Sequence, residues 1–502
     1  MPLDVFQPLL LLLLFLSVFG ASHACLQDPA SAYRFTGAVC RLTYPAAVVL
    51  NEKTTKVIET AFQHARYPSV KGEKSLLFVG RVIYGLHNLE IHNLSIGRSA
   101  FELHPGEGIA LEISNVSAVF RGNIQYGYGN WLVSVANSID FEIESQIDLG
   151  INAKLYCREG KVAADTSDCY LNFHKLHLHL QGDKEPNWLR KLFTDFITFT
   201  VKLAIKGQIC KEINKVANIL ADFIQDTADQ FLSYGDISVD IGVTAAPVIN
   251  ANYIESYHKG LTNYNKASTV INDSVFHPSQ LTENRMLYFW ISDQVFNPMF
   301  TAAHQDSHFQ LNISGAELTE LFKTNLSSTM PEFMRKCLLE SGSPQLRVWS
   351  SSVPYLNTST SGTTVLGKAS GQLHCWTQGT PILFFKMDMA MDITASYADK
   401  KLFLQGNPSE VFVLQAELSL QNQTLLDEDD MEFIREAVEK IGIPKVLSAM
   451  EIELTRLLDK QGINLFDIFN PEVLPRDGFV VIQMDFGFPH HLLTEFLRKT
   501  LQ

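Results

Sequence analysis

The sequence has few charged residues and no concentration of positive charge. Of its 502 residues, 40 are lysine or arginine and 54 are aspartate or glutamate, which gives a formal net charge of −14. Because contact with phosphates needs clustered lysine and arginine, this balance argues against a nucleic-acid-binding protein. It also argues against strong general attraction to anionic lipid surfaces. Residues 25–260 carry a net charge of −3 and residues 261–502 a net charge of −10, so the acidity lies mainly in the second half.

The sequence also lacks the short motifs of common catalytic and metal sites. It contains no GxSxG, HExxH, Walker A or CxxC pattern. His177 and His179 lie two residues apart, and His490 is followed by His491, but neither pair has an evident third ligand, so solvated positions are the better interpretation. The acidic run 427–430 lacks the glycine and the spaced ligands of a calcium loop, and the helix dipole explains acids at a helix start. We therefore predict no catalytic residue and no metal site.

The N-terminus lacks the usual basic residues of a secretory signal but has its other features. Leu9 to Phe19 form an apolar run, and Ser22 and Ala24 supply small residues for cleavage after Ala24. We expect residues 1–24 to be a signal peptide and the mature chain to begin at Cys25. No later stretch has about 18 uncharged apolar residues, so we expect no transmembrane helix.

Cysteines are scarce, whereas glycosylation sequons are not. Seven cysteines are too few for a fold held mainly by disulfides, and their odd number leaves at least one free or paired outside the chain. Seven Asn-x-Ser/Thr sequons agree with an extracellular glycoprotein. These glycosylation candidates are Asn93, Asn115, Asn272, Asn312, Asn325, Asn357 and Asn422.

Long periodic runs are the clearest structural signals. Apolar and polar residues alternate from Ile139 to Leu155, a run about three times as long as a typical strand. It predicts a long, twisted antiparallel sheet with one apolar face and one solvated face. Helical periodicity then runs from about Pro186 to Leu232. Because so long a helix is unusual in a globular protein, we expect it to bend or to lie along the long sheet.

The second half repeats this order of elements. We predict a short helix over 294–304, strands up to about residue 420, a helix over 427–461 and a strand over 479–486. The two halves share this order of elements but have little sequence identity to each other. The sequence therefore predicts two similar α+β domains. The Ser-, Thr- and Gly-rich segment 350–371 predicts an exposed loop.

The last residues predict an amphipathic helix that begins near Pro489. Its apolar stripe consists of Leu492, Leu493, Phe496, Leu497 and Leu501, whereas Glu495, Arg498 and Lys499 face away. An isolated helix of this length is marginal in water. The stripe must therefore pack on something apolar: the rest of the protein, as an ordinary terminal helix would, a lipid, or a lipoprotein surface.

Segments in both halves carry a resemblance to a known family. They are YGLHNLEI (84–91), DCYLNFHKL (168–176), KGQICKEIN (206–214), ADFIQ (221–225), RMLYFW (285–290), NLFDIFNPE (464–472) and RDGFVVIQMDFGFP (476–489). The chain resembles plasma members of the lipopolysaccharide-binding and bactericidal/permeability-increasing protein family. The resemblance extends over essentially the whole mature chain, except for about residues 325–385.

The resemblance implies an elongated, boomerang-shaped α+β fold. Two similar barrel domains, each with a long helix, are joined by a central antiparallel sheet and enclose a hydrophobic lipid tunnel. The implied divisions are an N-terminal domain at 25–258, a linker at 259–284, a C-terminal domain at 285–488 and a lid helix at 489–502 that guards the N-terminal lipid opening. The resemblance also implies a disulfide between Cys169 and Cys210 and lipid contacts at Gln225, Ser256 and His258.

By the same resemblance, we expect a secreted plasma protein that acts as a monomer. It would exchange neutral lipids (cholesteryl esters and triglycerides) and phospholipids between lipoprotein particles such as HDL, LDL and VLDL. Such exchange breaks no covalent bond, so it needs no catalytic residue, metal or other cofactor, and the bound lipids are its ligands.

Three alternatives remain open. Phospholipid transfer is disfavoured because the relatives that perform it lack a comparable C-terminal extension. Endotoxin binding in relatives uses a basic N-terminal domain, whereas residues 25–260 are slightly acidic here. A secreted lipid hydrolase is disfavoured by the missing nucleophile motif.

Overall fold

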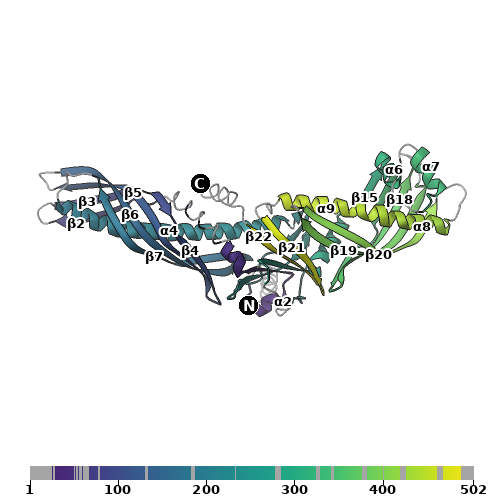
Figure 1. The fold of residues 1–502 in the computed structure, drawn as a ribbon, viewed down its shortest axis with the longest axis horizontal. Helices are drawn as coiled ribbons and strands as arrows, with labels where there is room; N and C mark the ends of the chain where they lie inside the picture. The colour runs from purple at the N-terminus through teal and green to yellow at the C-terminus, as the bar shows by residue number, and fades with distance from the viewer. Residues whose placement is uncertain are drawn as a thin grey trace, which may run out of the picture.

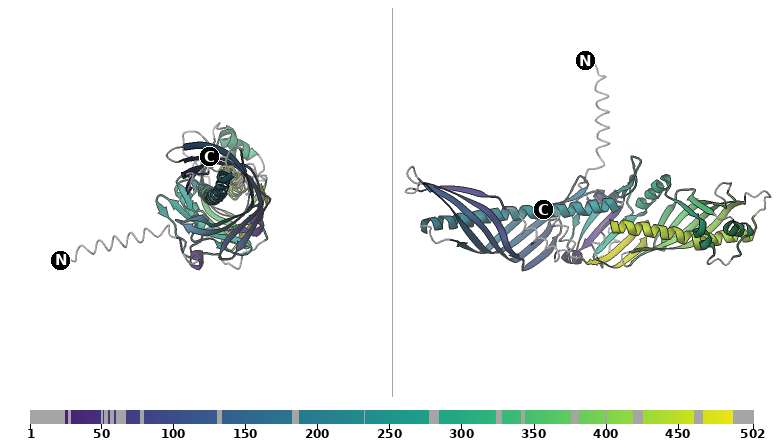
Figure 2. Two further views of the ribbon diagram at one scale, coloured as in Figure 1. Left: turned by 90° about the vertical axis from the view of Figure 1, so that its left-hand side faces the viewer. Right: turned by 90° about the horizontal axis from the view of Figure 1, so that it is seen from above.

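The computed structural model describes residues 25–26, 29–49, 51, 55, 59, 67–76, 80–129, 134–181, 187–231, 233–276, 284–323, 328–340, 344–375, 381–398, 401–418, 426–460 and 467–487. These residues form an elongated, bowed molecule with one lobe at each end and a sheet between them (Figure 1). Viewed along the long axis, the strands curl around a central helix (Figure 2). The expectation of a two-lobed, boomerang-shaped α+β fold is confirmed.

The N-terminal lobe is built on one six-stranded antiparallel sheet. The strand order is β2-β3-β5-β6-β7, and β4 pairs with β5. The strands are β2 (Val70–Leu76), β3 (Gly80–Ser95), β4 (Arg98–His104), β5 (Gly108–Gly129), β6 (Ser134–Arg158) and β7 (Lys161–Leu180). The run expected over residues 139–155 lies within β6, which is 25 residues long. The alternation therefore predicted the strand correctly but underestimated its length.

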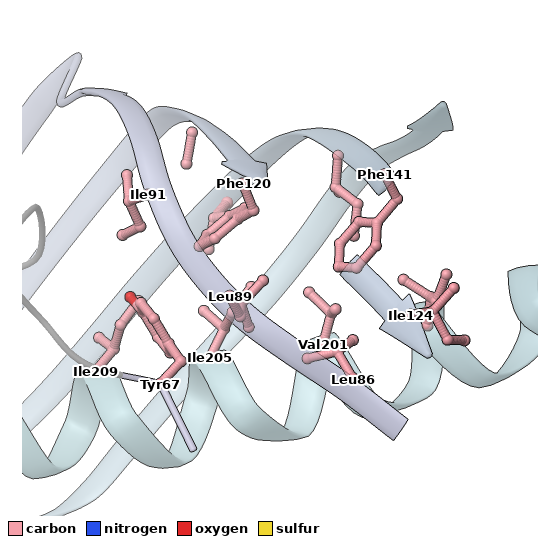
Figure 3. Close-up of a cluster of buried hydrophobic side chains, with 14 of the residues drawn as sticks. Tyr67, Leu86, Leu89, Ile91, Phe120, Ile124, Phe141, Val201, Ile205 and Ile209 are labelled. Atoms are coloured by element: carbon pink, nitrogen blue, oxygen red, sulfur yellow. The ribbon is translucent and has the colours of Figure 1, made fainter. Parts of the chain in front are cut away.

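A single helix of 45 residues, α4 (Asn187–Phe231), lies inside this curled sheet (Figures 1 and 2). Apolar side chains recur on one face at four-residue intervals, a spacing that keeps them on one stripe of a helix. The stripe consists of Leu189, Phe193, Ile197, Val201, Ile205 and Ile209, none of which is more than 5% exposed. Together with the inner faces of the strands it forms one apolar core (Figure 3). The long helix is therefore stabilised by the tertiary packing of its apolar stripe.

The C-terminal lobe repeats this plan with shorter elements. Its sheet has the strand order β15-β16-β18-β19-β20, with β17 paired to β18. The strands are β15 (Gln310–Ser314), β16 (Gln345–Ser350), β17 (Tyr355–Ser359), β18 (Gly362–His374), β19 (Leu383–Ala398) and β20 (Lys401–Leu418). Two short helices, α6 (Gly315–Lys323) and α7 (Glu332–Glu340), lie beside them. The helical block consists of α8 (Glu428–Ala437), a π-helical segment (Val438–Gly442) and α9 (Ile443–Lys460).

The prediction of an exposed loop over residues 350–371 is wrong, because β17 and β18 form a hairpin there. Thr358 is only 3% exposed, and its backbone N–H and its hydroxyl each donate a 2.7 Å hydrogen bond to the carboxylate of Asp293. Asp293 begins helix α5 (Asp293–Gln305). Serine and threonine made the segment look like a loop, but threonine is β-branched and fits a strand that packs against a helix.

A central sheet joins the two lobes, and strands from both halves of the chain contribute to it. Its order is β10-β11-β1-β14-β22-β21. The strands are β1 (Ala38–Thr43), β10 (Val248–Ile249), β11 (Tyr253–His258), β14 (Leu287–Ser292), β21 (Asp467–Arg476) and β22 (Phe479–Gly487). β1 pairs with β11 on one side and with β14 on the other. These pairings place Ala38 beside His258 and Ile291, which are 220 and 253 residues further along the chain.

A small four-stranded sheet lies beside the central sheet, in the order β13-β12-β9-β8. Its strands are β8 (Ser233–Tyr234), β9 (Ile237–Asp240), β12 (Leu261–Tyr264) and β13 (Ala267–Ser268). Two of these strands fall within residues 259–284, the expected linker. This part of the chain is therefore paired, and Leu261 faces Asp240 of β9 in the register.

Candidate functional site

One face of the central sheet is buried, whereas the other is only half-buried. Burial alternates residue by residue along β1 and β14, so every second side chain belongs to the half-buried face. The register places three rows of side chains across four strands. The rows are His258–Ala38–Ile291–Val480, Ser256–Cys40–Phe289–Ile482 and Ile254–Leu42–Leu287–Met484. We call these residues the central-sheet face.

The central-sheet face is apolar except for Ser256 and His258. Half-exposed positions of an antiparallel sheet normally carry polar side chains. Here every such position on β1, β14 and β22 in the three rows is apolar, so the apolar atoms are contiguous across strands from both halves of the chain. This contiguous, half-buried apolar surface is the candidate site for another apolar molecule or segment.

The two polar residues of the central-sheet face bind each other. His258 Nδ1 lies 2.7 Å from the backbone oxygen of Ile241, and His258 Nε2 lies 2.8 Å from Ser256 Oγ. Because a carbonyl only accepts, Nδ1 carries the proton and Nε2 accepts from the Ser256 hydroxyl. Burial lowers the pKa of His258, with the Ile241 hydrogen bond acting in the opposite direction. The imidazole is therefore neutral, and the face carries no charge that would oppose an apolar ligand.

Cys40, the unpaired cysteine, lies beside this pair. Burial raises the pKa of its thiol to about 12, and the Glu255 carboxylate adds to the shift. The thiol therefore stays protonated and behaves as a small apolar side chain.

The opposite face of the same sheet is held by a buried ion pair. Arg41 and Glu255 are 3% and 5% exposed, and Arg41 Nη2 lies 2.6 Å from Glu255 Oε2. Tyr257 donates a 2.7 Å hydrogen bond to the other carboxylate oxygen, and the Arg41 guanidinium lies 3.8 Å from the centre of the Tyr253 ring. Because successive side chains of a strand point to opposite faces, burial of Arg41 and Glu255 on this side goes together with Cys40 and Ser256 on the half-buried face.

The interior of the N-terminal lobe also contains a small apolar pocket. The pocket lies between α4 and strands β3, β5, β6 and β7, and every residue that lines it is apolar. Its lining includes Ile91, Phe120, Ile147 and Ile209. Figure 3 shows Ile91 and Phe120 together with Ile209, which belongs to the α4 stripe. Such a pocket favours hydrocarbon and offers no partner for a charged group.

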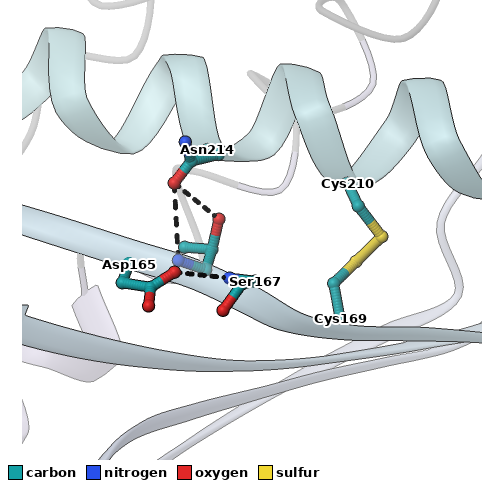
Figure 4. The surroundings of a disulfide bond; sticks show 6 residues. Asp165, Ser167, Cys169, Cys210 and Asn214 are labelled. Atoms are coloured by element: carbon teal, nitrogen blue, oxygen red, sulfur yellow. Dashed lines mark hydrogen bonds between the residues drawn. A yellow bond between two sulfur atoms is a disulfide. The ribbon is translucent and has the colours of Figure 1, made fainter.

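α4 is clamped to the edge strand β7 on the face that carries Cys210, Asn214 and Asn218. Cys210 forms the disulfide with Cys169 of β7 (Figure 4), the pair implied by the family resemblance. Asn214 Oδ1 accepts a 3.0 Å hydrogen bond from the hydroxyl of Thr166, and Asn218 Nδ2 donates a 3.2 Å hydrogen bond to the backbone oxygen of Ala164. The clamp fixes the helix against the sheet that encloses the pocket.

The structure describes only some of the other predicted site residues. Gln225 lies on α4, but its side chain is outside the described residues, as is the whole expected lid with Leu492, Leu493, Phe496, Leu497 and Leu501. The signal peptide, Asn325 and Asn422 are also outside them. The remaining sequon asparagines, Asn93, Asn115, Asn272, Asn312 and Asn357, are all exposed.

Two further disulfides were not predicted from the sequence. They join Cys25 to Cys157 and Cys337 to Cys375. Within the described ranges, no group of three or more His, Cys, Asp or Glu side chains is placed to hold a metal ion. In the same part of the chain, no helix has the length and apolarity needed to cross a membrane.

Sequence reasoning missed the central-sheet face. The alternation typical of a strand with two different faces is present in the sequence. Ala38, Cys40 and Leu42 alternate with Val39, Arg41 and Thr43. A six-residue run is too short to separate a strand from a buried helix segment. The apolar character of the face emerges only when β1 pairs with strands from distant parts of the chain.

The fold and this interior define a class: proteins with two lobes of curled sheet, each enclosing a long helix, joined by a shared sheet with an apolar face. The LBP / BPI / CETP family model for the N-terminal domain matches residues 49–224, and the model for the C-terminal domain matches residues 235–431. The chain belongs to the LBP / BPI / CETP family.

The chain is similar to several individual proteins and to one solved structure. The chain is 42% identical to cholesteryl ester transfer protein of Gallus gallus over 498 residues, which cover 97% of each chain. It is 42% identical to cholesteryl ester transfer protein of Homo sapiens over 495 residues, covering 96% of this chain and 98% of the relative. The lipopolysaccharide-binding protein of Mus musculus is 25% identical over 308 residues, 61% of each chain. A crystal structure of lipopolysaccharide binding protein aligns with a TM-score of 0.46 at 17% identity, covering 90% of this chain and 99% of that one.

Proposed function

We propose that this protein is a secreted, monomeric plasma carrier that exchanges neutral lipids, both cholesteryl esters and triglycerides, between lipoprotein particles, together with phospholipids. The observation that carries the proposal is the half-buried apolar face of the central sheet, which adjoins both lobes. The 42% identity to cholesteryl ester transfer proteins over almost the whole chain supports the choice of lipid.

The physical argument concerns the cost of moving an ester through water. Each CH₂ group that leaves an apolar environment costs about 0.8 kcal/mol, so unassisted desorption of a cholesteryl ester is prohibitively slow. A continuous apolar surface lowers this barrier because the lipid exchanges one apolar contact for another. No bond breaks, and the exchange runs down concentration differences, so neither a nucleophile nor a nucleotide is required.

We further propose the roles that the family resemblance implies for particular residues. Ser256 and His258 contact lipid on the central-sheet face, and Gln225 contacts lipid from α4. The stripe of Leu492, Leu493, Phe496, Leu497 and Leu501 closes the N-terminal opening as a lid. Docking on HDL, LDL or VLDL then depends on local apolar contacts, because a net charge of −14 gives no general attraction to anionic surfaces.

One observation favours a second candidate, lipid hydrolysis. Ser256 and His258 have the hydrogen bond of a nucleophile and a general base, and the Ile241 carbonyl orients the imidazole. The GxSxG motif that places a nucleophilic serine on a sharp turn is absent, and Ser256 lies within strand β11. We therefore rank transfer above hydrolysis.

The deciding experiment follows one radiolabelled lipid at a time from donor to acceptor lipoproteins with the purified protein. Recovery of intact cholesteryl ester and triglyceride in the acceptor supports neutral-lipid transfer. Free fatty acid would overturn it in favour of hydrolysis, and movement of phosphatidylcholine alone would favour a phospholipid carrier. The lipids extracted from the secreted protein, sorted by class, provide an independent check.

A further inference from the structure

The outer face of the β17–β18 hairpin carries a small exposed apolar patch. Tyr355 of β17 is 53% exposed, and Leu366 of β18 is 44% exposed. The two residues lie directly opposite each other in the register, and Ala390 of β19 follows Leu366 in the same row. Exposed positions of an antiparallel sheet are normally polar, so this row leaves an apolar surface open to a ligand or to a modification of the chain.

The hairpin is held so that the patch faces outward. Leu356 and Thr358, which alternate with Tyr355 and Asn357 along β17, are 9% and 3% exposed. The backbone of Leu356 exchanges two hydrogen bonds, of 2.8 and 2.9 Å, with the side-chain amide of Asn297 in α5. Because successive side chains of a strand point to opposite faces, Tyr355 and Asn357 share the exposed face.

Asn357 begins a glycosylation sequon, Asn357-Thr358-Ser359, on that exposed face. It lies two residues beyond Tyr355 in the same strand, so the two side chains start about 7 Å apart. Of the seven sequons, this is the one with an aromatic residue two positions before the asparagine. In the other six that position is isoleucine, valine, leucine, glutamine or lysine. A sugar attached at Asn357 would therefore have an exposed aromatic ring within reach.

The tyrosine ring and an N-linked sugar have complementary surfaces. One face of an N-acetylglucosamine ring consists of C–H bonds, and the face of an aromatic ring is negatively polarised. Stacking brings these surfaces together and removes apolar area of Tyr355 from water. In the next row of the sheet, Thr364 lies opposite Asn357 but donates its hydroxyl to Asp392 at 2.7 Å, so it does not occupy the Asn357 amide.

We propose that Asn357 carries an N-linked glycan whose first sugar stacks on Tyr355 and covers the row that continues to Leu366. The Asn357 side-chain nitrogen forms a bond to C1 of the sugar, and the bond from C1 to the diphosphate of a lipid-linked oligosaccharide breaks. The amide nitrogen loses a proton, which balances the lipid diphosphate that leaves. The inference goes beyond lipid transfer and rests on the secretion proposed above, because this donor belongs to the secretory pathway.

The test measures the occupancy of each sequon by mass spectrometry and the exposure of Tyr355 by hydroxyl-radical labelling. The protein is secreted from cells that make only high-mannose glycans, so that endoglycosidase H leaves one sugar at each occupied site. This single-sugar protein is compared with Asn357→Gln. The matched control is Asn312→Gln: Asn312 is exposed on β15, at an edge of the same sheet, and its sequon also ends in serine, but Gln310 stands two residues before it.

We expect Asn357 to be occupied and Tyr355 to be labelled roughly twofold or more weakly in the single-sugar protein than in Asn357→Gln. Hydrogen exchange in the β17–β18 hairpin should be roughly 2- to 10-fold faster in Asn357→Gln, the range for one aromatic contact. In a Tyr355→Ser background, Asn357→Gln should have no such effect. Asn312→Gln should change neither the labelling of Tyr355 nor hydrogen exchange in β15.

A bare Asn357 beside occupied sequons elsewhere would overturn this inference and leave the carrier function standing. Tyr355 labelling that did not rise on removal of the sugar would also overturn it, and persistently low labelling would assign the patch to another occupant, such as a second copy of the chain. Equal acceleration of exchange with and without the Tyr355 ring would refute the stacking. If no sequon at all were occupied, the proposed secretion itself would fail.

Discussion

The two lobes use the same plan, a long helix inside a curled antiparallel sheet, but they hold the helix differently. In the N-terminal lobe one unbroken stripe from Leu189 to Ile209 is buried along α4. Among the described side chains of the α8–α9 block in the C-terminal lobe, the buried apolar residues fall into two groups, Phe433 with Ile434 and Ile443 with Leu447. Between them, the π-helical segment Val438–Gly442 contributes no buried residue.

The interruption has a local cause. The Ile443 N–H donates to Val438 O, five residues back, instead of to the carbonyl four residues back. Pro444 follows and cannot donate, and Gly442 weakens helix in its interior. A π-turn accommodates such a change of path. The fully buried residues of this block therefore belong to two clusters, which Val438 and Met389 both contact, whereas the buried α4 stripe belongs to one cluster.

The attachment of the helices to their edge strands differs as well. α4 is joined to β7 by a disulfide and by Asn214 and Asn218, whereas Glu451 of α9 accepts a 2.6 Å hydrogen bond from the backbone of Leu404 in β20. The C-terminal disulfide joins Cys337 of α7 to Cys375, away from α9. Two lobes of similar design can therefore differ in how readily the helix separates from the sheet. We expect α9 to open more easily than α4.

The largest expected effect is on lipid transfer and comes from substitutions in the proposed lid, which would close only the N-terminal lobe. Leu493→Asp with Phe496→Asp removes two large apolar side chains, each contributing about 1.5–3 kcal/mol when buried. We expect at least a tenfold loss of cholesteryl ester transfer with normal secretion. Radiolabelled transfer and the amount of protein in the medium are the measurements.

The matched control for the lid variant is Arg498→Gln with Lys499→Gln, which makes the same change in net charge on the polar face of the helix. This control should transfer normally. Unchanged transfer by the folded Asp variant, or an equal loss in the control, would refute the lid and with it this asymmetry between the lobes.

The next largest effect is a loss of stability when the disulfide between α4 and β7 is removed. Cys169→Ser with Cys210→Ser opens a loop whose ends are 41 residues apart, and loop-closure entropy predicts a loss of about 3–4 kcal/mol. Hydrogen exchange should accelerate along α4 and leave α9 unchanged. The paired variant Cys337→Ser with Cys375→Ser, with a separation of 38 residues, should affect the C-terminal lobe instead. Equal acceleration in both helices from either variant would contradict independent lobes.

A smaller effect is expected at the hydrogen bond between α9 and β20. Glu451→Ala leaves the Leu404 N–H without its acceptor, and a hydrogen bond to a charged group contributes about 1.5–3 kcal/mol. We expect faster hydrogen exchange in α9. Asn218→Ala, the corresponding change on α4, should have less effect because the disulfide remains. If Asn218→Ala accelerated hydrogen exchange in α4 more than Glu451→Ala accelerates it in α9, the disulfide would not be the stronger attachment.

The smallest effect concerns the sheet that joins the lobes. The pKa of His258 is lowered in the folded protein, relative to an unfolded value of about 6.5. The unfolded chain therefore binds more protons as the pH falls, so this contribution to stability is complete above about pH 6.5 and is lost below it. His258→Asn should flatten the pH dependence of the free energy of unfolding, measured by urea titration at each pH, by at most about 1.4 kcal/mol per pH unit. If the variant kept the same pH dependence of unfolding, His258 would not be the source of that dependence.

The local elements were predictable from the sequence because long strands and helices repeat their pattern many times. β6 and α4 were found in this way, and so were α5 and β22. The hairpin over residues 350–371 was misassigned, because its serines and threonines resemble a loop until Thr358 is seen bound to Asp293. The Cys169–Cys210 pair came from the family resemblance, whereas the Cys25–Cys157 and Cys337–Cys375 pairs link segments whose proximity no local pattern reveals.

The amphipathic elements, their order and their repetition can be read from the amino-acid sequence, because periodicity is a local property of the chain. Which apolar faces are filled by protein depends on long-range strand pairing and helix packing. The face with Cys40 and Phe289 stays half-buried because β1, β11, β14 and β22 meet there, whereas the α4 stripe is covered completely. Alternation shows that a strand has two faces, but only the long-range pairing determines what each face meets.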